Sequence, residues 1–135
     1  FTHILHFAQK KLGMDLNMYK HLITPLKDEE LSRHPNGARL RAVKHACRPL
    51  IIDGPNCIIG CLPDKTLFML QDSKKLRPGI VGGASGMFAF SSEMCGLDAA
   101  IPARNKRDDF QPMKYDTVIV PPNRQEFVRW NQWER

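Results

Sequence analysis

The sequence contains few cysteines, and their spacing argues against a metal or redox motif. Only four Cys occur in 135 residues, and none forms a CxxC pair, the spacing expected of structural zinc sites and thioredoxin-like motifs. Cys57 and Cys61 are four residues apart in an apolar stretch. On a strand both side chains would share one face, so we expect small buried hydrophobic residues there. We expect no metal and no cofactor, and a reducing, cytoplasmic compartment.

Long hydrophobic runs are also absent, so we expect no membrane-spanning helix. No apolar run approaches the roughly 18 residues that a span requires, and we therefore expect no membrane partner. The composition is that of an ordinary folded protein, with 42% hydrophobic and 25% charged residues. The length predicts one compact domain. The sequence begins at Phe1, with no capping residue before Thr2, so we expect a further segment upstream.

Acidic residues are absent from one segment of this basic chain, whose formal net charge is +6. Between Arg33 and Arg48 the charged residues are all basic: Arg33, Arg39, Arg41, Lys44 and Arg48. Such a segment can bind nucleic acid. It lacks aromatic residues that would stack on bases, and an acidic run, Asp28, Glu29 and Glu30, precedes it. A solvated helix face or a docking surface for a protein partner is the preferred interpretation, with no nucleic acid bound.

The order of the expected elements predicts an α+β protein, with helices followed by antiparallel strands. Helical periodicity predicts helices from residue 1 to 12, ended by Gly13, and from Asp15, its cap, to about residue 24. A charged segment over 26–37 precedes a helix over 38–47. Apolar runs predict strands over 50–52, 57–62, 66–70, 80–81, 87–90, 115–120 and 127–130, arranged as a meander. Ser92 is expected to cap a short helix over 93–99, and 103–113 is expected to be a loop.

Three short patterns invite a functional reading, and each has a simpler explanation. The glycine-rich run over 82–86 lacks the Lys-Ser/Thr of a phosphate-binding loop and suits a hairpin turn. The Ser91-Ser92-Glu93 sequence lacks a nucleophile elbow and a nearby His. His3 and His6 share a helix face but have no evident third metal ligand. The residues themselves therefore predict no catalytic site.

The second half nevertheless resembles a known family. Three runs carry the resemblance, in order and at matching spacing: residues 53–59 (DGPNCII), residues 71–78 (QDSKKLRP) and residues 87–98 (MFAFSSEMCGLD). They are similar to the class II glutamine amidotransferase domain, a member of the N-terminal-nucleophile hydrolases, and most of all to that of glutamate synthases. The likeness covers most of residues 1–120, as the C-terminal part of such a domain.

The resemblance implies a four-layer αββα sandwich and the hydrolysis of glutamine to glutamate and ammonia. It implies an N-terminal Cys nucleophile and an Asn-Gly oxyanion hole. It places these upstream, together with the Arg and Asp that hold the substrate, so no residue here is assigned a catalytic or substrate-binding role. The implied partners are the upstream part of the domain, or a subunit carrying it, and a synthase domain or subunit that receives the ammonia.

The residues that match the family motifs are expected to be structural. Asp72, Arg77 and Pro78 match a "D…RP" turn, in which a charged Asp–Arg pair would fix the strand connection. Ser92 and Glu93 match an "SE" pair, in which Ser92 would cap a helix and Glu93 would brace the sheet behind the glutamine pocket. Two departures, at residues 111–114 (QPMK) and 55–56 (PN), leave open a non-catalytic scaffold or regulatory subunit with the same fold.

Overall fold

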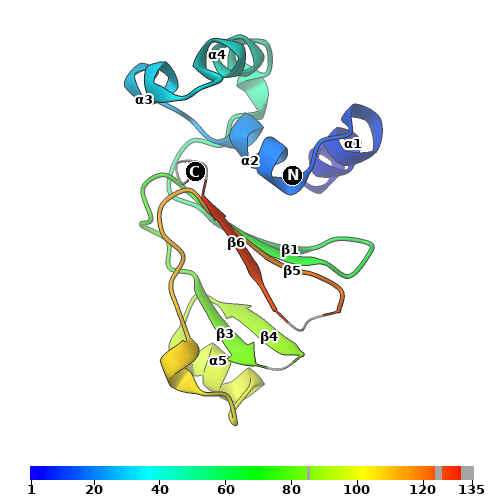
Figure 1. Cartoon of the computed structure of the whole chain (residues 1–135), viewed down its shortest axis with the longest axis vertical. Helices are drawn as coiled ribbons and strands as arrows, with labels where there is room; N and C mark the ends of the chain where they lie inside the picture. Colours follow the sequence, from blue (N-terminus) through cyan, green and yellow to red (C-terminus); the bar gives the residue numbers. More distant parts are fainter. Residues whose placement is uncertain (85, 124–125, 132–135) are drawn as a thin grey trace. The chain divides into compact units, whose positions relative to one another are not determined.

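A computed structural model describes residues 1–84, 86–123 and 126–131 of the chain. The residues group into two compact units, residues 1–54 and residues 55–135. The first unit is helical and the second contains all the strands that are described (Figure 1). The coarse prediction of an α+β protein, helices first and antiparallel strands after, is thus confirmed. None of the helices in the described residues is long and apolar enough to cross a membrane.

Unit 1 consists of four α-helices and one 3-10 turn: α1 (Thr2–Leu12), α2 (Leu16–Ile23), α3 (Asp28–Arg33), α4 (Gly37–Ala46) and η1 (Arg48–Leu50). Local signals set the first boundaries as predicted. Gly13 ends α1 in the left-handed conformation, with φ at 64°. The Asp15 carboxylate accepts a hydrogen bond from the Met18 N–H at 2.7 Å and so caps α2.

One helix of unit 1 was not predicted, and one predicted strand is wrong. Helix α3 lies in the charged segment over 26–37, for which no element was predicted, and the Glu30 carboxylate closes its first turn by accepting the Lys27 N–H at 2.8 Å. The strand expected over residues 50–52 is absent. Pro49 lies in the 3-10 turn η1 instead, because its fixed φ suits the first positions of a helical turn. The β-branched Ile51 and Ile52 that follow are not in a strand.

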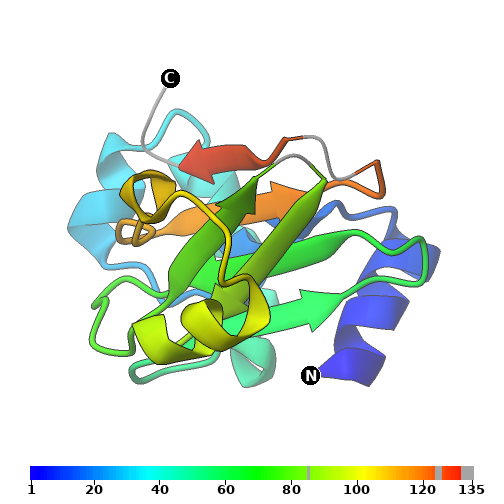
Figure 2. The ribbon, with the colours of Figure 1, turned by 90° about the horizontal axis from the view of Figure 1, so that it is seen from below.

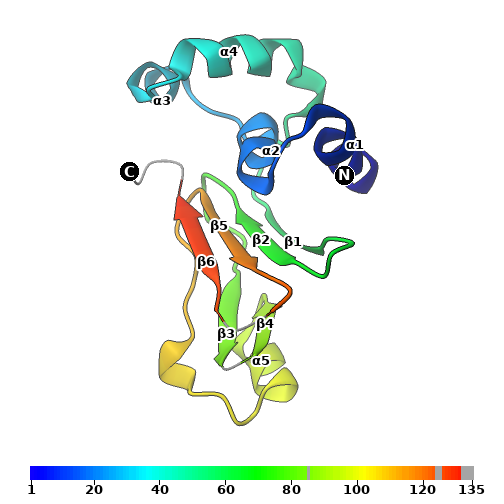
Figure 3. The ribbon, with the colours of Figure 1, turned by 45° about the vertical axis from the view of Figure 1, so that its right-hand side comes forward.

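Unit 2 contains two antiparallel sheets. The larger has the order β1 (Cys57–Cys61), β2 (Leu67–Gln71), β5 (Asp116–Val120), β6 (Val128–Asn131), and the smaller pairs β3 (Ile80–Ala84) with β4 (Met87–Ser91) (Figure 3). Both predicted hairpins are confirmed. The expected meander is wrong, because β2 pairs with β5 rather than with β3, and Leu67 lies opposite Val120.

The core of unit 2 lies between its two sheets. Met69 of β2 and Val118 of β5 pack with Val81 of β3, and all three are at most 1% exposed. The short helix α5 (Met94–Ala100) packs against β4 and buries Leu97 completely. Within this unit, a helix, the two-stranded sheet and the four-stranded sheet therefore follow one another as layers (Figure 2). The 3-10 turn η2 (Lys106–Asp108) lies in the segment expected to be a loop.

Candidate functional site

The buried carboxylate of Asp72 holds together the loop of residues 71–78, the second of the three family-like runs. It follows β2 and is 6% exposed. Its Oδ1 accepts hydrogen bonds from the Gln71 Nε2 at 2.9 Å and the Lys75 N–H at 2.7 Å, and its Oδ2 accepts one from the Asn56 N–H at 3.3 Å. The Asp72 carbonyl accepts the Tyr115 N–H at 3.2 Å. Asp72 thus connects the loop after β2 to the residues that immediately precede β1 and β5.

The charged pair expected between Asp72 and Arg77 is wrong. No ion pair joins them within the described part of the chain, and the side chain of Arg77 is exposed, as is Pro78. The backbone carbonyl of Arg77 instead accepts the Gln71 Nε2 at 3.3 Å. Two backbone N–H groups and the Gln71 side-chain amide donate hydrogen bonds to the buried Asp72 carboxylate, so its burial does not require an arginine partner.

The capping role predicted for Ser92 is also wrong. Ser91, one residue earlier at the end of β4, accepts the Glu93 N–H on its Oγ at 3.2 Å, a local turn that serine favours. Ser92 is exposed, and α5 has Glu93 at its N-cap without a side-chain cap. The Cys95 thiol donates to the exposed Glu93 carboxylate at 3.3 Å, and this hydrogen bond raises the pKa of Cys95. The bracing role of Glu93 stays a prediction.

A buried arginine that the sequence did not single out fastens the loop after α5. The Arg104 side chain is fully buried, and its Nε and Nη2 both contact the Asp109 carboxylate, at 2.8–3.0 Å. Its Nη2 also contacts Asp98 at 2.8 Å, and its Nη1 donates to the Ile101 carbonyl at 3.1 Å. The hydrogen bonds that Arg104 donates to Asp109, and after them the one to Asp98, raise the pKa of Arg104.

The Arg104 cluster also explains a glycine of the run over 82–86. A Cβ on Gly82 would lie 2.5 Å from the Asp109 Oδ1, 2.9 Å from the Leu97 Cδ1 and 3.1 Å from the Arg104 Nε. Glycine is therefore required at this position by the close approach of buried side chains. The hairpin expected here is confirmed by the pairing of β3 with β4.

A third buried carboxylate, that of Asp116, lies at the start of β5. Its Oδ2 accepts the Arg129 Nε at 2.7 Å and the Met113 N–H at 2.6 Å. Its Oδ1 accepts the Asn131 Nδ2 at 2.7 Å. The Asp116 side chain is 0% exposed. Like Asp72, this carboxylate accepts three hydrogen bonds, which occupy most of its roughly four lone-pair sites, so it positions strands.

The cysteines and histidines are dispersed over the surface and the core. Cys57 is half-buried against the core cluster, as expected, but Cys61 is exposed, contrary to the prediction that both are buried. The structure assigns no disulfide to any of the four cysteines in the part of the chain that it describes. His3 and His6 are exposed. In the ranges that the structure describes, no group of three His, Cys, Asp or Glu residues has the geometry to hold a metal ion.

The basic segment of unit 1 is not a uniformly solvated face. Lys44 is only 6% exposed, and its Nζ donates to the backbone carbonyls of His21 and Thr24 at the end of α2. Burial lowers the pKa of Lys44 to about 8. Burial also lowers the pKa of His21 to about 4, helped by the positive charges of His34 and Lys44. Arg41, in contrast, is exposed and pairs with Asp28 at 3.4 Å.

The three buried carboxylates of unit 2 share a structural role. The carboxylates of Asp72, Asp109 and Asp116 are engaged by donors, so they fix loops and strands rather than move protons. Their partners include backbone N–H groups and, for Asp116, side chains more than ten residues away in sequence, which a short sequence motif does not show.

Compared with protein-family models, curated proteins and solved structures, the chain has no match.

Proposed function

We propose that this chain forms a structural part of a class II glutamine amidotransferase domain. The domain hydrolyses glutamine to glutamate and ammonia, and the ammonia is delivered to a synthase site. The support is the order and spacing of the three runs over 53–59, 71–78 and 87–98. In the complete domain, the layers of unit 2 belong to a four-layer αββα sandwich.

One observation carries this proposal. The Asp72 carboxylate accepts three hydrogen bonds and holds the loop of residues 71–78, which has the family-like sequence, against the approaches to β1 and β5. A buried aspartate whose carboxylate accepts hydrogen bonds from the surrounding loop suits a motif with a structural role. This supports a role for the segment in positioning the sheet.

The chemistry is supplied by residues outside this sequence. An N-terminal Cys thiolate attacks the amide carbon, the C–N bond breaks, and ammonia leaves after taking a proton from the α-amino group of that Cys. Water then hydrolyses the thioester to release glutamate and restore the thiol. Backbone and amide donors of an Asn-Gly pair stabilise the oxyanion. The partner is an upstream part of the domain or a subunit carrying it, in the cytoplasm, where the four free thiols stay reduced.

The test is glutamine hydrolysis by the full protein, purified with every subunit that stays bound. We expect equal amounts of glutamate and ammonia, and complete loss of both after treatment with a diazoketone analogue of glutamine, which alkylates a nucleophilic thiol. The alternative is a non-catalytic scaffold or regulatory subunit of the same fold, which the departures at residues 55–56 and 111–114 favour. Absence of glutamine hydrolysis in the intact assembly would contradict the proposal and leave that alternative.

A further inference from the structure

Unit 1 contains a cavity between α2 and α4 that the proposed amidotransferase chemistry does not use. Its volume is about 340 Å³. The apolar part of its lining consists of Met14, Met18, Leu22, Leu40 and Val43. Two of these, Met18 and Val43, are 52% and 37% exposed, so the cavity is open to solvent. Thioether side chains such as those of Met14 and Met18 adapt readily to the shape of a ligand.

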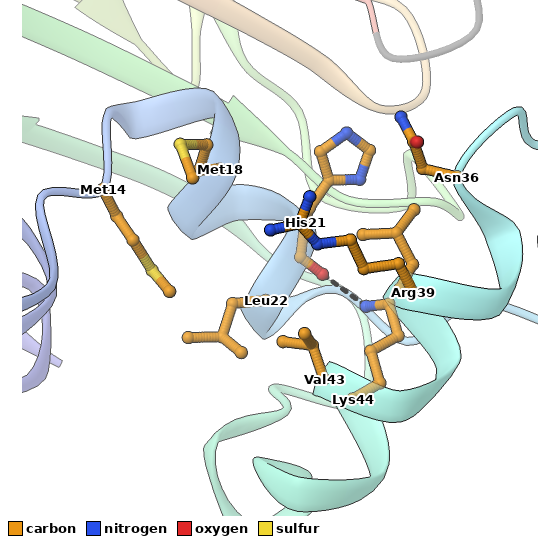
Figure 4. Close-up of a pocket in the computed structure, with 9 residues that line it drawn as sticks. Met14, Met18, His21, Leu22, Asn36, Arg39, Val43 and Lys44 are labelled. Atoms are coloured by element: carbon orange, nitrogen blue, oxygen red, sulfur yellow. Dashed lines mark hydrogen bonds between the residues drawn. The ribbon is translucent and has the colours of Figure 1, made fainter.

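The charged part of the lining has one sign. Arg39 and Lys44 line the cavity, and no Asp or Glu does among the residues that the structure describes. Figure 4 shows Arg39 reaching from α4 toward α2, and Lys44 donating to the His21 carbonyl. Arg39 forms no ion pair with any described residue. An apolar cavity with two cations and no acid is complementary to an anion.

Lys44 strengthens this argument because it is a buried cation without a described counter-ion. A lysine ammonium has three N–H donors, and two of them are used by the carbonyls of His21 and Thr24. The ammonium thus has one donor beyond those two hydrogen bonds, and Lys44 is a lining residue of the cavity. Buried lysines are usually paired with an anion. A ligand carboxylate would provide the counter-ion that the described residues do not give Lys44.

We propose that this cavity binds a small organic anion with an apolar body, a carboxylate of a medium-length alkyl chain or of an aromatic ring. The carboxylate contacts Arg39 and Lys44, and the apolar body lies against the side chains of Met14, Met18, Leu22, Leu40 and Val43. A cavity of about 150 Å³ holds one benzene molecule, so this one accommodates roughly 10 to 13 non-hydrogen atoms. Octanoate falls within that range.

The test is calorimetric titration of the full protein with octanoate, in the absence of glutamine. We expect one octanoate per chain, and binding at least tenfold weaker for octylammonium, which has the same chain and the opposite charge. Arg39→Gln should weaken octanoate binding about tenfold. Arg41→Gln is the matched control, because Arg41 lies on the same helix, is exposed and pairs with Asp28 outside the cavity. It should leave the affinity within twofold of that of the parent protein.

A second variant fills the cavity rather than removing its charge. Val43→Trp places a large side chain at an exposed lining position, so the fold should persist, as circular dichroism would verify, while octanoate binding is lost. Equal binding of octanoate and octylammonium, or unchanged affinity in both Arg39→Gln and Val43→Trp, would overturn the proposal. So would octanoate binding only after removal of a bound subunit, which would assign the cavity to a protein interface. Glutamine hydrolysis is measured separately, so either proposal can fail alone.

Discussion

The two units bury polar groups in different ways. In unit 2 the buried carboxylates of Asp72, Asp109 and Asp116 have cations or N–H donors as partners. In unit 1 the buried cation Lys44 has backbone carbonyls as its described partners and lies beside an open cavity. Unit 2 therefore uses its buried charges to secure loops and strands, which suits a scaffold. Unit 1 keeps a charge available, which suits a binding site.

The largest expected effect tests whether the buried charges of unit 2 are structural. Asp116→Ala removes the buried carboxylate that accepts hydrogen bonds from the Arg129 guanidinium, the Asn131 amide and the Met113 N–H. We expect the free energy of unfolding to fall by about 3–5 kcal/mol, measured by urea denaturation. Arg41→Gln in unit 1 breaks an exposed ion pair and should cost less than about 1 kcal/mol. Equal losses would remove the contrast between the units.

Asp72 provides a sharper test within unit 2. Asp72→Ala removes the acceptor of three hydrogen bonds and should lower the free energy of unfolding by about 2–3 kcal/mol. Arg77→Gln should change it by less than about 0.5 kcal/mol, because Arg77 is exposed. Both variants are compared by urea denaturation. A loss for Arg77→Gln as large as that for Asp72→Ala would restore the Asp–Arg pair that the sequence predicted.

The pH dependence of stability tests the burial of His21 in unit 1. The pKa of His21 is about 4 in the folded protein, below its ordinary value of 6.5, so the unfolded chain binds the proton more readily. Stability from this residue is complete above pH 6.5 and is lost progressively as the pH falls from 6.5 toward 4.

We expect a loss of roughly 2 kcal/mol, allowing for partial solvent access, in denaturation curves of the parent protein recorded at pH 7 and pH 4.5. His21→Gln should reduce this difference. A variant whose pH dependence matches that of the parent protein would show that His21 is not responsible.

Single side-chain hydrogen bonds at the ends of helices and strands give the smallest effects. Asp15→Ala removes the cap of α2 and should cost about 1 kcal/mol. Ser91→Ala removes the acceptor of the Glu93 N–H and should cost about 0.5–1 kcal/mol. Ser92→Ala should change the free energy of unfolding by less than about 0.5 kcal/mol. Thermal denaturation of the three variants ranks them, and a larger loss for Ser92→Ala than for Ser91→Ala would reverse the assignment made by the structure.

Local signals predicted much of the fold. Gly13 and Asp15 mark helix boundaries through backbone conformation and capping, which neighbouring residues determine. The helix α3 was missed because its six residues include only one buried apolar residue, Leu31, and show no helical periodicity. The order of the larger sheet was missed because the pairing of β2 with β5 joins distant parts of the chain, which a local pattern does not encode.

The candidate site was predictable only in part. Asp72 stood out within a motif, but its partners are mostly backbone N–H groups that no side-chain pattern reveals. Arg104 and Asp109 lie in a segment that reads as a solvated charged loop, and only the fold buries them. The cavity of unit 1 likewise depends on the spacing between α2 and α4. Burial, rather than residue type, separates these residues from ordinary surface charges.

The proposed function requires that this chain support glutamine hydrolysis by a nucleophile that lies outside its 135 residues. The most direct measurement is peptide mapping of the full assembly after inactivation by an isotopically labelled diazoketone analogue of glutamine. We predict one label per assembled domain, on an N-terminal cysteine that is not among the four of this sequence, Cys47, Cys57, Cys61 and Cys95. Loss of glutamine hydrolysis accompanied by a label on any of those four cysteines would contradict the account.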